Sequence, residues 1–78
     1  MDEIIQKIIQ KIAELCDKDP ADITPDTKLV EDLEMKSPTM VILIAYLEDE
    51  FDVSIDFMKF KRYPSVGEAA GFIDTLMQ

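Results

Sequence analysis

The chain has 78 residues, of which 17 are acidic and 8 basic, and it contains no histidine. We expect one domain over residues 1–78 with a thin core, because a chain of this length buries only about 60% of its unfolded surface. The net charge of −9 opposes nucleic acid and anionic membranes as partners and favours basic protein surfaces. Since 47% of the residues are hydrophobic, the chain should fold.

Residues 2–16 are predicted to form an amphipathic helix. Six apolar residues recur there at steps of three and four: Ile4, Ile5, Ile8, Ile9, Ile12 and Leu15. Cys16 is the only cysteine, which excludes an internal disulfide and a cysteine-based zinc site, and we expect it to be a small buried apolar side chain.

Membrane insertion is not expected. The longest run without a charged residue, 37–47, is too short to cross a bilayer. No basic segment precedes an apolar stretch at the start, so no signal peptide is visible. We therefore expect a cytoplasmic protein. We also expect it to be a monomer.

Residues 17–36 are predicted to form a long connection interrupted by Pro20 and Pro25. Isolated apolar residues should pin it to the helices: Ile23, Leu29, Val30 and Leu33. Loops of this length inside a compact domain are uncommon and often functional.

A second helix is predicted to begin at Ser37-Pro38, with Ser37 as its N-cap and Pro38 as its first helical residue. Five residues form its core stripe: Met40, Leu43, Ile44, Leu47 and Phe51. Four further apolar residues lie outside or at the margin of that stripe: Val41, Ile42, Ala45 and Tyr46. They are either buried at the flanks of the bundle or form a docking patch for a partner. The acidic rim of such a patch would be Glu31, Asp32, Glu48 and Asp49.

The rest of the chain predicts a connector and two more helices. Residues 52–55 are expected to be extended, and 56–62 to form a short helix anchored by Phe57 and Phe60. A capping box at Ser65 and Glu68 opens the last helix. Its stripe is Val66, Ala69, Ala70, Ile73 and Met77. The fold class is therefore an all-α four-helix bundle with three longer helices, one short helix and a long first loop.

The residue inventory opposes catalysis. Without histidine there is no histidine base and no serine–histidine or cysteine–histidine pair, and two glycines do not make a phosphate-binding loop. The acidic pairs lack the calcium-loop pattern, so we expect solvated acidic faces and no metal site. Ser37 is either simply a helix cap or an anchor for a phosphodiester, since a helix N-terminus attracts phosphate.

These residues resemble the acyl carrier protein family across almost the whole chain. The resemblance rests on Glu31-Asp32-Leu33, Ser37, and the run Leu47-Glu48-Asp49-Glu50-Phe51. It implies that Ser37 carries 4'-phosphopantetheine, attached covalently from coenzyme A, whose thiol holds an acyl group as a thioester.

The resemblance also implies partners and a pathway. The partners would be a phosphopantetheinyl transferase, then acyl-loading and acyl-using enzymes of fatty acid or specialised lipid or polyketide biosynthesis. Their basic patches would meet the acidic rim and the exposed face of the second helix: Glu31, Asp32, Pro38, Val41, Ile42, Ala45, Glu48 and Asp49.

The sequence departs from the family around the serine. The family's glycine, variable residue and Asp-Ser-Leu correspond here to Glu34, Met35 and Lys36-Ser37-Pro38. Glu34 would occupy backbone angles that suit glycine. Lys36 either contacts the prosthetic phosphate or repels a basic modifying enzyme.

Other departures lie on the second and third helices. Thr39 and Ile42 stand where acidic residues are common, and three bases make the third helix unusually positive: Lys59, Lys61 and Arg62. Two alternatives stay open, an unmodified protein-interaction module with this fold and a peptidyl or aryl carrier. The identity of the acyl group cannot be inferred from the sequence.

Overall fold

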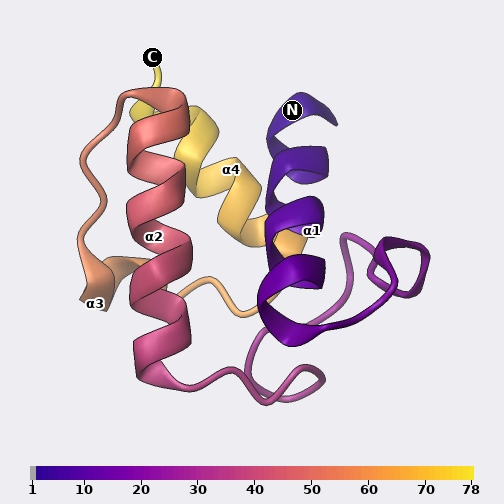
Figure 1. Cartoon of the computed structure of the whole chain (residues 1–78). Helices are drawn as coiled ribbons and strands as arrows, with labels where there is room; N and C mark the ends of the chain where they lie inside the picture. The colour runs from indigo at the N-terminus through magenta and orange to yellow at the C-terminus, as the bar shows by residue number, and fades with distance from the viewer. Residues whose placement is uncertain (1) are drawn as a thin grey trace.

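The structure, a computed structural model, describes residues 2–78 and forms four α-helices (Figure 1). The helices are α1 (Asp2–Cys16), α2 (Ser37–Phe51), α3 (Phe57–Phe60) and α4 (Val66–Leu76), and a 3₁₀ turn covers Pro20–Asp22. No strand occurs within residues 2–78. The predicted all-α bundle is confirmed.

α1 packs against both α2 and α4. In Figure 1, α1 and α2 run side by side in opposite directions, α4 crosses behind them, and α3 lies beside the lower half of α2. The core fills the space between these helices. Its largest fully buried side chains are Phe60, Ile8, Ile12, Leu29, Leu43, Leu47, Ile73 and Val66. Burying each of these side chains stabilises the fold by roughly 1.5–3 kcal/mol before the cost in chain entropy.

α1 and α2 both end at an aspartate in the left-handed conformation, Asp17 with φ 55° and Asp52 with φ 53°. After each aspartate, the next residue donates its backbone N–H to a carbonyl in the last turn. Lys18 N lies 2.9 Å from Ala13 O, and Val53 N lies 3.2 Å from Glu48 O. Glycine is the usual residue at such a helix end, and aspartate tolerates these angles better than most residues.

Backbone hydrogen bonds tie the long connection to the start of α4. Leu29 N donates to Pro64 O at 2.9 Å, and Val66 N donates to Thr27 O at 3.0 Å. Ile23 and Leu29 are buried, as predicted, and Leu33 is half-buried. Val30 was predicted to help pin the connection, but this is wrong because its side chain is 57% exposed.

α3 is shorter than predicted, because the segment after Phe60 turns toward α4. Asp56 caps the helix by accepting the backbone N–H groups of Met58 and Lys59. Phe60 is fully buried, and the Tyr63 ring stacks on Phe72 with 4.7 Å between centroids. These contacts fix the position of the basic segment that follows α3.

Ser65 is the N-cap of α4, as predicted, but the Glu68 side chain bonds the Ser65 hydroxyl and not the Ser65 backbone N–H of a full capping box. Glu68 N donates to Ser65 Oγ at 3.2 Å, and the Ser65 hydroxyl donates to Glu68 Oε1 at 3.0 Å. Two expectations about burial are wrong: Met77 is 50% exposed, and Cys16 is only half-buried. Each lies at or just beyond the end of its helix, where fewer neighbours cover it.

One ion pair joins α1 to the end of α2. Lys7 Nζ lies 2.6 Å from Glu50 Oε1. The hydrogen bond to Glu50 and the attraction between the two charges raise the pKa of Lys7 above its ordinary value. α2 has no basic residue in its last turn, where the helix dipole is negative, so Lys7 supplies a positive charge near three consecutive acids, Glu48, Asp49 and Glu50.

Candidate functional site at the start of α2

α2 and its N-cap both begin one residue earlier than the sequence predicted. Lys36 is the N-cap, with φ −94° and ψ 164°, and Ser37 is the first helical residue. The first intrahelical bond confirms this register, since Met40 N donates to Lys36 O at 3.0 Å. The prediction that Ser37 is the N-cap is therefore wrong, and Pro38 is the second helical residue.

The Ser37 side chain is exposed, and no hydrogen bond within residues 2–78 uses its hydroxyl. The backbone N–H groups of Ser37 and Thr39 belong to the first turn, where a helix has no internal acceptor for them. Pro38 has no N–H to offer. A free hydroxyl therefore stands beside two unpaired donors at the positive end of a helix of 15 residues.

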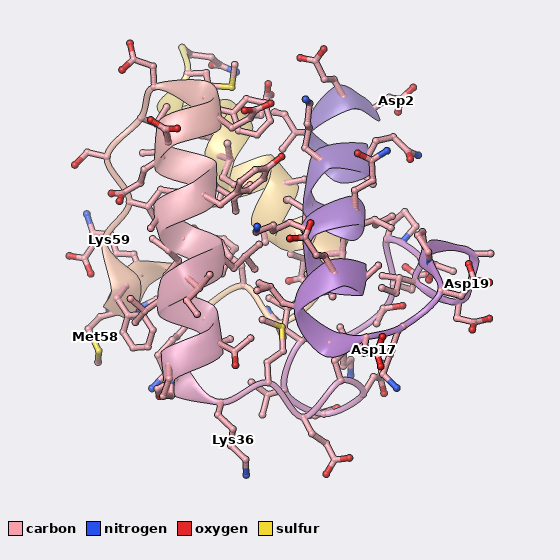
Figure 2. All side chains as sticks on the ribbon, in the orientation of Figure 1. Asp2, Asp17, Asp19, Lys36, Met58 and Lys59 are labelled. Carbon is pink, nitrogen blue, oxygen red and sulfur yellow. The ribbon has the colours of Figure 1, made fainter. Side chains whose placement is uncertain are left out.

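A tight turn sets the direction in which the chain enters α2. Glu34 N donates to Val30 O at 3.0 Å, and Met35 N donates to Leu29 O at 3.1 Å. Glu34 has φ 54°, in the left-handed region that favours glycine. The expectation that Glu34 occupies glycine-like angles is confirmed. Buried Met35 anchors the turn, and exposed Lys36 extends away from the bundle (Figure 2).

The predicted acidic rim divides between the two ends of α2. Near its start, Glu31 Oε2 lies 3.3 Å from Lys28 Nζ, and Asp32 Oδ2 accepts the backbone N–H of Lys28 at 2.8 Å. Near its end, half-buried Glu48 accepts the N–H of Ile55 at 2.8 Å, while Asp49 is exposed. Glu48 therefore also holds the connector after α2, a role that its sequence position did not reveal.

The residues of α2 outside the core stripe form one continuous face. Val41 is 54% exposed and Ile42 51% exposed, and Pro38, Ala45 and Asp49 are exposed as well. These five residues follow the offsets 0, 3, 4, 7 and 11, which place them on the same side of a helix. We call this set the outer face of α2. Tyr46 lies at its margin, half-buried, with Lys11 Nζ 5.0 Å from the ring centroid.

α3 and the residues after it carry exposed bases. Lys59, Lys61 and Arg62 are exposed and take part in none of the ion pairs found within residues 2–78. Met58 is 65% exposed and points outward beside Lys59 (Figure 2). The exposure of Val30 was not anticipated from sequence, because Val30 is an apolar residue next to buried Leu29.

Two cavities lie near this end of the bundle. One of about 530 Å³ is lined by four aspartates and one lysine, together with Thr27 and Leu33. A smaller one of about 200 Å³ is lined by residues of the long connection, by Met40 of α2 and by residues 61, 63 and 64. Within residues 2–78, no group of three or more His, Cys, Asp or Glu side chains could hold a metal ion.

The family described as "Phosphopantetheine attachment site" matches residues 6–73. An acyl carrier protein of Borreliella burgdorferi is 36% identical over 72 residues, covering 92% of this chain and 90% of that protein. This chain belongs to the acyl carrier protein family. An acyl carrier protein of Thermotoga maritima is 30% identical over 73 residues, 94% of this chain and 90% of that protein. The meromycolate extension acyl carrier protein of Mycobacterium tuberculosis is 32% identical over 75 residues, 96% of this chain and 65% of that protein.

As a member of this family, the chain carries a covalently bound 4'-phosphopantetheine and acts as an acyl carrier in fatty acid or related biosynthesis. The end of the bundle where α2 begins fits such a group. It offers an exposed primary hydroxyl, unpaired backbone donors and an exposed lysine, all suited to a phosphate ester. None of the helices within residues 2–78 has the length and apolar character needed to cross a membrane.

Proposed function

We propose that Ser37 is the residue that carries 4'-phosphopantetheine. The chain has three serines. Ser65 is 8% exposed and its hydroxyl is engaged at the N-cap of α4. Ser54 is exposed in the connector after α2, two residues before the N-cap of the four-residue helix α3, and is not part of any helix. The observation that carries the proposal is the exposed Ser37 hydroxyl, without a hydrogen-bond partner, in the first turn of α2.

The modification needs little from this chain beyond access. The Ser37 hydroxyl forms a bond to the phosphorus of the pantetheine half of coenzyme A, loses its proton, and displaces the nucleotide half. When bound, the group supplies a thiol at the end of a flexible arm, which holds an acyl group as a thioester. The N–H groups of Ser37 and Thr39 would hold the phosphate at the positive end of α2. The tether keeps the cargo at high effective concentration near successive enzymes.

Lys36 is proposed as a second phosphate contact and as a determinant of transferase choice. It precedes Ser37 directly, is exposed and forms no ion pair within residues 2–78. A positive charge there stabilises the phosphate ester but repels a transferase whose surface is basic. Transfer rates for the Lys36→Asp variant should differ from those of the parent, and equal rates with every transferase tried would remove this role.

Partner enzymes are proposed to dock on the outer face of α2. Its apolar centre, Val41, Ile42 and Ala45, lies between acids at the two ends of the helix. This is the arrangement of a protein interface, with an apolar core and a polar rim. Basic patches on acyl-loading and acyl-using enzymes would meet Asp32 and Asp49 first, in brief and salt-sensitive contacts. Glu31 contributes less because Lys28 offsets its charge, and Glu48 contributes less because it is half-buried and accepts the N–H of Ile55. Asp32 accepts a backbone N–H but is exposed and keeps its charge unpaired within residues 2–78.

The carrier role is favoured over the two alternatives. The family match weighs against an unmodified interaction module, and the curated relatives named above are acyl carriers, which weighs against a peptidyl or aryl carrier. The pathway is proposed to be fatty acid synthesis or a specialised branch of lipid or polyketide synthesis.

Tandem mass spectrometry of protein purified from its native cells tests the proposal. Ser37 and Ser54 lie on one tryptic peptide, so fragmentation within that peptide has to locate the modification. Phosphopantetheine on Ser37 is the expected result. An unmodified Ser37 in all of the native protein would favour the interaction module. Phosphopantetheine on Ser54 would show that Ser54, and not Ser37, is the attachment site.

A further inference from the structure

The smaller cavity lies beneath the attachment end of α2. Met40 contributes to its wall and follows Ser37 by three residues, so the two side chains are neighbours on one face of the helix. The other walls come from the long connection and from the segment between α3 and α4. The cavity therefore lies within one helical turn of Ser37, the proposed point of attachment of the arm that carries the acyl group.

The floor of the cavity is apolar. Leu29 and Met40, 1% and 5% exposed, and half-buried Tyr63 line it. Val30, 57% exposed, stands at its edge. An exposed valine beside an apolar cavity marks a place where an apolar ligand gains buried contact. At roughly 30 Å³ for each water-sized group, the volume of about 200 Å³ holds six or seven such groups.

The rim of the cavity is positively charged, which is unusual in a chain of net charge −9. Lys28, Glu31 and Lys61 all line it. Glu31 offsets the charge of Lys28, since its Oε2 lies 3.3 Å from Lys28 Nζ. Lys61 forms no ion pair within residues 2–78, and its Nζ lies 5.5 Å from the centroid of the Phe57 ring. Lys61 thus supplies the net positive charge of the rim, whereas the larger cavity is lined mainly by aspartates.

We infer that this cavity selects an acyl cargo with an apolar middle and a carboxylate at its far end over one that ends in a methyl group. The inference rests on the proposed attachment at Ser37. The apolar part of the chain covers Leu29, Met40 and Val30, and the terminal carboxylate pairs with Lys61. A methyl end would gain the same apolar contact but leave Lys61 unpaired. Because Lys61 is exposed, the preference should be modest, about two- to fivefold.

The test compares two cargoes of equal length on the whole protein. Octanedioyl and octanoyl phosphopantetheine are transferred from their coenzyme A thioesters by a broad-specificity transferase. Thioester cleavage by hydroxylamine is then timed, with each rate divided by that of the matching free coenzyme A thioester. We expect the octanedioyl form to be cleaved two- to fivefold more slowly, and its NMR spectrum to show shifts of the Met40 methyl group relative to the protein carrying the unacylated arm.

Lys61→Gln and Lys59→Gln form a matched pair of variants. Both lysines are exposed and belong to the same basic segment, but only Lys61 lines the cavity. Lys61→Gln should abolish the difference between the cargoes, and Lys59→Gln should preserve it. Equal protection of both cargoes in the parent, stronger protection of octanoyl, or equal effects of the two variants would overturn the inference. Failure of the proposed attachment gives a distinct result, because the parent protein would then take up no cargo or Ser37→Ala would still take it up.

Discussion

Gly67 donates its backbone N–H to the carbonyl oxygen of Pro25 at 2.8 Å, and a Cβ atom on Gly67 would lie 3.2 Å from that same oxygen. This contact fastens the long connection to the first turn of α4. A side chain at this position has to push the connection outward, because the nearest atom is backbone and cannot rotate away.

Gly67→Ala is expected to destabilise the protein by about 1 kcal/mol, since the crowding exceeds the gain in helix propensity. Gly71→Ala is the matched control, because a Cβ there meets nothing within 4 Å. The control should stabilise α4 by roughly 0.5–1 kcal/mol. Urea unfolding followed by circular dichroism measures both. If Gly67→Ala stabilised the protein as much as Gly71→Ala, the tight attachment of the connection would be disproved.

Glu34→Gly is expected to stabilise the protein by about 1 kcal/mol. Glu34 has φ 54°, and a residue with a Cβ atom is destabilised by roughly 1–2 kcal/mol in the left-handed region. Glycine removes this cost, but its greater entropy in the unfolded chain offsets part of the gain. Glu34→Ala keeps the Cβ and should change stability little. The same urea titrations apply, and a destabilised Glu34→Gly would show that the Glu34 side chain makes a contribution larger than the strain.

The ion pair between Lys7 and Glu50 should make stability fall at alkaline pH. The pKa of Lys7 is raised in the folded state, so the pair's stabilisation is complete below the ordinary lysine pKa near 10.4 and is lost as pH rises through the folded value. The useful quantity is the difference in unfolding free energy between the parent and Glu50→Gln, because this difference isolates the Lys7–Glu50 pair. The gap between the two unfolding free energies should stay constant below about pH 10 and shrink as pH rises above about 10.4, and a gap that did not shrink there would contradict the linkage.

The helices could be predicted well from sequence, because their signals are local. The isoleucine spacing of α1 and the stripe from Met40 to Phe51 repeat at the helical period over whole elements. The predicted bounds of α1 match Asp2–Cys16, and α2 begins one residue earlier than predicted. The same pattern placed Val41 and Ile42 outside the core stripe but left open whether the flanks of the bundle bury them. The structure exposes both residues, Val41 by 54% and Ile42 by 51%.

What sequence could not supply depends on contacts between distant segments. The hydrogen bond between Glu48 and Ile55 arises only once the connector folds back along α2, and the pairing of Leu29 with Pro64 joins residues 35 positions apart. Val30 is exposed because its neighbour Leu29 takes the inward position. Ser37 was assigned as the cap from residue preference alone, whereas the backbone angles give that place to Lys36.

Ile42→Glu should reduce partner docking and leave the fold intact. Ile42 is 51% exposed, so its replacement should change stability by less than about 0.5 kcal/mol. A central apolar contact of an interface is worth more than about 1 kcal/mol, which corresponds to a fivefold or larger loss in kcat/KM of a partner enzyme. Leu76→Glu, at a partly exposed position on α4, is the control and should leave kcat/KM unchanged. Equal losses of kcat/KM in both variants would show that partner enzymes do not dock specifically on the outer face of α2.

The attachment of phosphopantetheine at Ser37 is tested most directly by intact mass after incubation with coenzyme A and a broad-specificity transferase. Parent protein and Ser54→Ala should each gain one phosphopantetheine, and Ser37→Ala should gain none. A Ser37→Ala protein that still took up the group, or a parent protein that took up none from any transferase, would contradict the assignment of Ser37 as the carrier residue.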